Sequence, residues 1–124
     1  MRSAQRLARK LGAHEYVDTK KVAAADGPQK LGGADLVLAT APHADAIAST
    51  VGGLKPRGKL LVVAAPFDPL ELSAFPLLTG KTVAGWPSDS AIDSEETMAF
   101  IVLTNVLPRT EVFKLEQADA VLTP

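Results

Sequence analysis

The stretch GGLKPRGKLLVVAAP, residues 52–66, decides the fold. Its run KLLVVAA (residues 59–65) is apolar without alternation, which is typical of a strand buried on both faces of a parallel sheet. The two glycines end a helical pattern, and KPRG (residues 55–58) predicts a turn before the strand. Pro66 ends the strand, because proline has no backbone N–H to add to a sheet.

Other strands are predicted by similar short apolar runs. These are ADLVLAT (34–40), KTVAGW (81–86) and a shorter one, HEYVDT (14–19). The C-terminal stretch TEVFKLEQADAVLTP (110–124) predicts one more short strand and a turn of helix. Strands that alternate with helices at this spacing predict an α/β fold, with a mostly parallel sheet between two layers of helices.

Helices are predicted where apolar residues recur three and four positions apart. One stripe is Ala4, Leu7, Ala8 and Leu11, closed by Gly12 in the left-handed conformation, and another is Ala44, Ile47, Ala48 and Val51. A third helix starts near Asp93, three residues before Glu96, the spacing of a capping box. Residues 20–33 are helical in composition, but their Asp-Gly-Pro turn predicts one poor helix or two fragments.

Composition restricts the classes of protein. A chain of 124 residues, 47% hydrophobic and 22% charged, is expected to form one globular domain over residues 1–124. Its apolar runs are far shorter than the roughly 20 residues of a spanning helix, so we expect no membrane association. With no cysteine and two histidines, we expect no zinc or other metal in this chain.

The first 30 residues carry an excess of basic residues. No aromatic side chains for stacking accompany them, so we expect no nucleic-acid partner.

The opening MRSAQRLARKLGA is also similar to a mitochondrial presequence. We favour the interpretation that this segment is a core-facing helix rather than a targeting sequence. We therefore expect the protein in the cytoplasm.

Three predicted strands end in small residues followed by proline. These ends are Thr40-Ala41-Pro42, Ala64-Ala65-Pro66 and Gly85-Trp86-Pro87-Ser88. In open α/β sheets ligands bind in the crevice beyond the carboxyl ends of the strands, and small side chains leave room there for a flat ligand. The alternative is that these prolines only end the strands and begin the loops, as proline does in many proteins, and have no role in binding a ligand.

The segments RLARKLGAHEYVDT, GGADLVLATAP, LKPRGKLLVVAAP and LLTGKTVAGWPSDS, in this order, resemble the cofactor domain of the zinc-type alcohol dehydrogenases, the medium-chain dehydrogenase/reductase family. The resemblance implies a Rossmann fold that binds NAD or NADP. It also implies that residues 40–42, 64–66 and 86–88 line the nicotinamide end of the cofactor. Arg2 and Ser3 are the residues expected near a 2′-phosphate.

Several parts of that family pattern are not in this sequence. It has no G-x-G, the pattern whose backbone approaches the pyrophosphate, and the resemblance implies that the catalytic zinc domain and the first two strands are absent. We therefore expect a partial cofactor domain, inactive alone, whose alcohol or carbonyl substrate belongs to the complete enzymes of the family. The alternative is a non-enzymatic remnant or assembly module.

Without two central strands, the sheet has two alternatives. Either residues 14–19 move across to pair with residues 34–40, or the latter strand becomes an exposed edge that invites pairing with another chain. We expect marginal stability, with self-association through that edge or dependence on a partner.

Other polar and aromatic residues have simpler interpretations. Tyr16 and Trp86 are expected to pack in the core more readily than to stack on a ligand, and His43 to lie on the surface at a helix start. The acidic group Asp89, Asp93, Glu95 and Glu96 fits a helix N-terminus better than a cation site.

Overall fold

The computed structural model describes residues 2–87 and 90–122. The chain divides into two compact units, Met1–Ser88 and Asp89–Pro124, and each is described by itself. The first unit contains α1 (Arg2–Lys10), α2 (Asp26–Lys30), β1 (Ala34–Ala39), α3 (Ala44–Thr50), β2 (Leu54–Val62) and β3 (Thr82–Gly85). The second contains α4 (Ala91–Thr104) and α5 (Ala118–Leu122). Short 3-10 helices cover Val51–Gly53, Phe75–Thr79 and Leu115–Gln117.

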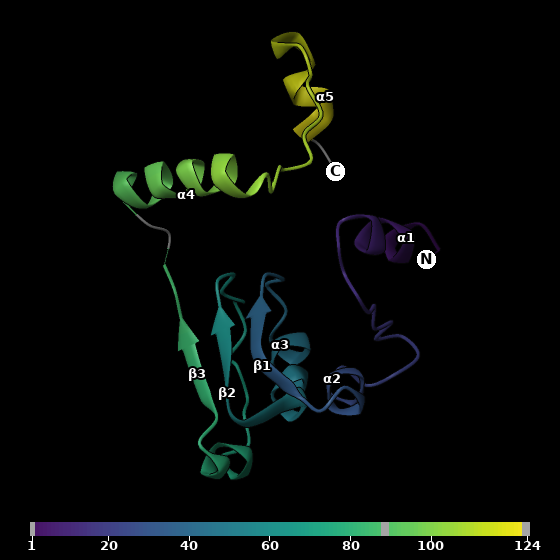
Figure 1. The fold of residues 1–124 in the computed structure, drawn as a ribbon, viewed down its shortest axis with the longest axis vertical. Coiled ribbons are helices and arrows are strands. Elements are labelled where there is room, and N and C mark those ends of the chain that lie inside the picture. The colour runs from purple at the N-terminus through teal and green to yellow at the C-terminus, as the bar shows by residue number, and fades with distance from the viewer. Residues whose placement is uncertain (1, 88–89, 123–124) are drawn as a thin grey trace. The chain divides into compact units, whose positions relative to one another are not determined.

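The three strands form one parallel sheet in the order β1-β2-β3 (Figure 1). Leu60, in the middle of β2, lies opposite Val37 of β1 and Val83 of β3, so these three side chains share one face. The predicted α/β class and parallel sheet are confirmed.

One face of the sheet carries the core. Ile47 of α3 and Val51 pack against it, and the fully buried side chains are Leu54 and Leu60, with partial cover from Leu70 and Leu72. The other face carries Leu36 and Leu38, which are 56% and 55% exposed. Within the described residues the buried core is therefore small. The expected marginal stability stays a prediction.

The turn predicted at residues 55–58 lies inside β2. The pairing of β1 with β2 jumps from Ala34↔Leu54 to Leu36↔Lys59, so the residues between form a bulge on β2. Arg57 adopts a left-handed φ of 63° there. A Cβ at Gly58 would lie 2.8 Å from the carbonyl oxygen of Ala34, so only glycine fits this crossing of the two strands.

Two strand predictions are wrong. Residues 14–19 form no strand: residues 15–18 have no regular secondary structure, and a turn begins at Thr19. Residues 110–114 are irregular, and the chain then continues into the 3-10 helix Leu115–Gln117 and α5. Each of these runs is short and has no neighbouring strand among the described residues, and a strand forms only where another strand accepts its hydrogen bonds.

The predicted helices mostly hold. Helix α1 ends as expected, with Gly12 at a φ of 99°, although Leu11 of its apolar stripe is 65% exposed. Residues 20–33 contain one short helix, α2, which includes the Asp-Gly-Pro sequence that predicted a turn. His43 is exposed at the N-cap of α3, as expected.

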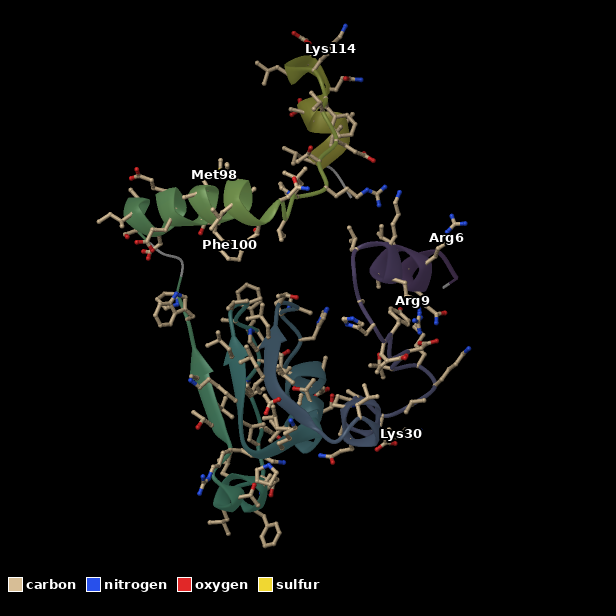
Figure 2. All side chains as sticks on the ribbon, viewed as in Figure 1. Arg6, Arg9, Lys30, Met98, Phe100 and Lys114 are labelled. Carbon is tan, nitrogen blue, oxygen red and sulfur yellow. The ribbon has the colours of Figure 1, made fainter. Side chains whose placement is uncertain are left out.

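In the second unit, α4 has no buried side chain within the described part of that helix. Met98 and Phe100 project from opposite sides of it, and both are more than half exposed (Figure 2). Its N-cap is Ser90 rather than Asp93, and Asp93 stands at the third helical position and binds back to Ser90. No described helix is long and apolar enough to cross a bilayer.

Candidate functional site

The carboxyl ends of the three strands meet at one edge of the sheet, because all three run in parallel. The backbone N–H of Val63 donates to the carbonyl oxygen of Ala39 at 3.1 Å, and that of Trp86 donates to Val62 at 3.0 Å. These two hydrogen bonds extend the pairing beyond the regular strands. The structure therefore brings the predicted residues after β1, β2 and β3 to a common edge.

Strand β2 ends at Val62, three residues before the end that its apolar run predicted. Ala64 and Pro66 are half-buried beyond it, and Ala65 is exposed. Trp86 follows β3 directly and is 59% exposed, so the expectation that it packs in the core is wrong. Its indole lies at the strand end, where a planar ring could stack on it.

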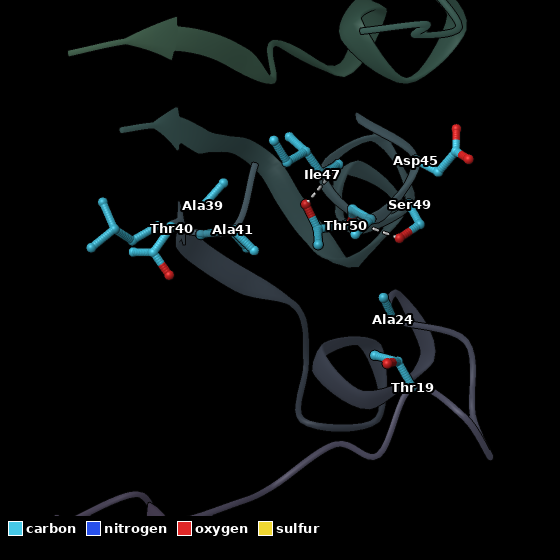
Figure 3. A pocket seen from close by; sticks show the side chains of 12 residues that line it. Thr19, Ala24, Ala39, Thr40, Ala41, Asp45, Ile47, Ser49 and Thr50 are labelled. Atoms are coloured by element: carbon cyan, nitrogen blue, oxygen red, sulfur yellow. Dashed lines mark hydrogen bonds between the residues drawn. The ribbon is translucent and has the colours of Figure 1, made fainter. Parts of the chain in front are cut away.

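A cavity of about 500 Å³ lies between the end of β1, α3 and the turn before α2 (Figure 3). This volume falls in the usual range of small-molecule sites, about 300 to 1,000 Å³. Apolar side chains form most of its wall. The lining residues are Thr19, Ala24, Val37, Leu38, Ala39, Thr40, Ala41, Asp45, Ala46, Ile47, Ser49 and Thr50.

The polar groups of this cavity are few. The hydroxyls of Ser49 and Thr50 donate to carbonyl oxygens of their own helix, Ala46 and Ile47, both at 2.7 Å (Figure 3). The hydroxyls of Thr19 and Thr40 and the carboxylate of Asp45 are the remaining side-chain polar groups of the lining. A ligand here would thus meet apolar walls, hydroxyls and one negative charge.

These features fit one part of a nicotinamide dinucleotide and not another. Small side chains and apolar walls suit a flat base, and hydroxyls with a carboxylate suit the ribose hydroxyls. A diphosphate needs backbone N–H groups or cations, yet residues 40–43, 63–67 and 86–87 contain no Lys or Arg. Helix α3, which follows β1, is only seven residues long, and Asp45 in its first turn would repel a phosphate.

The predicted site residues divide into three groups. Thr40 and Ala41 line the cavity, and Pro42 follows them in the chain. Residues 64–66, Trp86 and Pro87 lie at the same edge of the sheet but not in the cavity wall. Ser88 lies outside the described residues, and so do the side chains of Arg2 and Ser3, whose backbone belongs to α1. Their role in binding a cofactor stays a prediction.

Sequence reasoning missed Asp45, Ser49 and Thr19 as cavity residues. Asp45 and Ser49 are four residues apart in a predicted helix that follows a predicted strand. The helical period therefore could have predicted that both side chains lie on the same side of that helix. Thr19 was assigned to a strand that does not form, and its position depends on the turns before α2. Within residues 2–87 and 90–122, no three acidic or histidine side chains come together as metal ligands.

Comparison with known proteins identifies the family. The family model described as zinc-binding dehydrogenase matches residues 2–102. Alcohol dehydrogenase patD of Penicillium expansum is 39% identical over 116 residues, which is 93% of this chain and 34% of that protein. The chain thus spans about a third of the length of such curated relatives.

Solved structures show the same fold. An alcohol dehydrogenase zinc-binding domain protein from Burkholderia ambifaria has a TM-score of 0.85 and 25% identity, covering 98% of this chain and 35% of its own. A zinc-binding dehydrogenase from Sinorhizobium meliloti 1021, solved bound to NADP, has a TM-score of 0.73 and 22% identity, over 88% of this chain and 34% of its own. The parallel α/β sheet, the family model and these relatives together show that the chain belongs to the zinc-type alcohol dehydrogenase family of medium-chain dehydrogenases/reductases.

Proposed function

We propose that residues 1–124 form part of the cofactor side of an NAD(P)-dependent, alcohol dehydrogenase-like oxidoreductase of the cytoplasm. The single observation that carries the proposal is the shared edge at the carboxyl ends of β1, β2 and β3. There, small residues, the exposed Trp86 and an apolar cavity provide room for a flat ring. The solved relative with bound NADP supports the choice of cofactor class.

We further propose that this chain does not turn over an alcohol or carbonyl substrate by itself. The strand ends offer no cation to a diphosphate, and the sequence contains no G-x-G. The one charged group of the cavity wall, Asp45, is negative. The groups that bind the diphosphate and the catalytic groups would then come from protein outside these 124 residues, which correspond to about a third of the length of the relatives.

Binding and turnover are tested separately. The purified chain is titrated with nicotinamide riboside, NADH and NADPH, and binding is followed by calorimetry and by Trp86 fluorescence. We expect weak, saturable binding in which the diphosphate of the dinucleotides adds little affinity over nicotinamide riboside. Ala41→Phe, which fills the cavity, should abolish binding, whereas Ala13→Phe, at an exposed position after α1, should not.

Three results would contradict the proposal. No saturable binding of any of the three ligands would remove the cofactor assignment. Binding that is equal in Ala41→Phe and in the parent would place it elsewhere than the cavity. Reduction of NAD or NADP by the purified chain with any alcohol would show that the chain binds the diphosphate and catalyses hydride transfer by itself.

The second candidate is an assembly module without catalytic function. The observation that favours it is the edge position of β1, which pairs only with β2 among the described strands. A chain that binds no nucleotide but associates through this edge would favour the second candidate over the first.

A further inference from the structure

Trp86 has a fixed place on the edge proposed for the cofactor. Its backbone N–H donates to the carbonyl oxygen of Val62 at 3.0 Å, which continues the pairing of β3 with β2 beyond the last regular residues. The side chain is 59% exposed, and it is the one tryptophan of the chain. The position of the indole therefore follows from the register of β2 and β3 and does not depend on the open side of β1.

The cavity and Trp86 lie two strands apart along this edge. Thr40 and Ala41, which line the cavity, follow β1, whereas Trp86 follows β3, and β2 lies between them. Neighbouring strands are about 4.8 Å apart, so the two places are separated by about 10 Å across the sheet. A nucleoside spans such a distance. A ligand with its ribose at the hydroxyls of the cavity can thus reach the indole with its ring.

The charges that follow the strand ends are negative. Residues 40–43, 63–67 and 86–87 contain no Lys, Arg, Asp or Glu, and His43 is their only titratable side chain. In the sequence, the first charged residue after each of these segments is an aspartate: Asp45, Asp68 and Asp89. Asp45 is itself part of the cavity wall. This edge therefore favours a positively charged ligand over a neutral ligand of the same shape.

We propose that Trp86 makes this site prefer the oxidised nicotinamide ring to the reduced ring, an inference that rests on the function proposed above. The oxidised ring is a pyridinium cation, whereas the reduced dihydropyridine ring is neutral. Both rings stack on an indole, but only the cation is attracted by the negative face of its π system, and tryptophan gives the strongest attraction of this kind. Tighter binding of the oxidised form also makes the bound reduced cofactor a stronger hydride donor.

Two ribosides of the same size test the preference on the 124-residue chain. Nicotinamide riboside carries the cationic ring, and dihydronicotinamide riboside carries the neutral ring. We expect calorimetry to show tighter binding of the cationic form, with a factor of about two to five due to Trp86. Trp86→Leu should lower the ratio of the two affinities by this factor and keep the parent's circular dichroism. Trp86→Phe should lower it less, because phenylalanine keeps an aromatic face that attracts a cation more weakly.

A matched control is available at the other end of β3. Phe75 is 78% exposed in the 3-10 helix that precedes this strand, so Phe75→Leu also removes an exposed aromatic ring and should leave the ratio of affinities unchanged.

Absorption spectroscopy gives a signature of direct stacking. An electron-rich indole stacked on an electron-poor pyridinium ring produces a charge-transfer band that neither group has alone. The parent with nicotinamide riboside should show this band. Trp86→Leu with the same riboside, and the parent with the neutral riboside, should not.

The remaining results are distinguishable. Equal affinity of the parent for the two ribosides overturns this proposal and leaves the proposed function intact, whereas no binding of either riboside overturns both. A preference that survives Trp86→Leu and disappears in Asp45→Asn would assign it to the carboxylate and overturns the role of Trp86. A ratio that Phe75→Leu lowers as much as Trp86→Leu overturns it as well.

Discussion

The side-chain amide of Gln29 donates to the backbone carbonyl of Gly52 at 2.7 Å and joins α2 to the turn that leads into β2. The two segments are in close contact there: a Cβ at Gly53 would lie 3.2 Å from side-chain atoms of Pro28. Gln29 thus holds a five-residue helix, too short to be stable alone, against the sheet.

Loss of this donor should therefore loosen α2. We expect Gln29→Glu, which keeps the size of the side chain but removes the N–H donors, to lower the free energy of unfolding by about 1 kcal/mol. Lys30→Gln, on the neighbouring exposed residue, should change it by less than about 0.5 kcal/mol. Urea denaturation of both variants measures the difference, and equal values would show that the Gln29 hydrogen bond does not contribute.

The bulge in β2 should depend on glycine at position 58. In Gly58→Ala the new methyl group would meet the carbonyl oxygens of Ala34 and Lys55 at 2.8 and 3.0 Å, so one strand must shift. We expect a loss of about 1 to 3 kcal/mol, in the range of overpacked sites. Gly85→Ala is the control, because its Cβ would find only ordinary contact, 3.8 Å from the Val62 carbonyl. A Gly58→Ala variant as stable as Gly85→Ala would contradict the bulge geometry.

The small core makes the first unit sensitive to a single truncation. Leu60 is 0% exposed at the centre of the sheet, and Leu60→Ala should cost about 2 to 5 kcal/mol. Since small domains have about 5 to 15 kcal/mol of stability in total, this variant should be largely unfolded on mild heating. Leu78→Ala, at a residue 81% exposed, should melt within a few degrees of the parent in calorimetry. Similar melting of both variants would contradict the assigned core.

The sequence predicted the buried strands well because their signal is local. The runs at 34–40, 59–65 and 81–86 contain few polar residues and correspond to β1, β2 and β3 within a few residues. The exposed-edge alternative for residues 34–40 is also what the described part of the structure shows, with β2 as the one neighbour of β1.

What could not be predicted depends on contacts between distant segments. The polar and apolar residues at 14–19 suit a strand, but no strand is available to pair with them among the described residues. The cavity joins Thr19 to Asp45, 26 positions apart, and no periodicity relates two such residues. For the candidate site, the sequence located the ends of β1 and β3 to within one residue and placed the end of β2 three residues too late. The wall formed by α3 required the packing of that helix on β1.

The last prediction concerns pH and the start of α4. The carboxylate of Asp93 accepts hydrogen bonds from the Ser90 hydroxyl at 2.6 Å and from the Ser90 backbone N–H at 3.0 Å. The side-chain bond first, and then the backbone bond, lower the pKa of Asp93 below its ordinary value of 3.8. Because the folded pKa is the lower one, this cap stabilises α4 fully above the ordinary value and is lost as the pH falls through the folded pKa.

We therefore expect the helical circular dichroism of α4 to decrease on acidification below pH 3.8, with Asp93→Asn showing the weaker helix start already at neutral pH. Glu95→Gln is the matched control, because it removes one negative charge near the same helix end without removing the bond to Ser90. A shared acid transition in the parent and Asp93→Asn would assign the loss to other carboxylates. NMR titration of the Asp93 carboxyl carbon measures the sign of its pKa shift directly. A midpoint above 3.8 would mean that the bonds to Ser90 do not favour the ionised form.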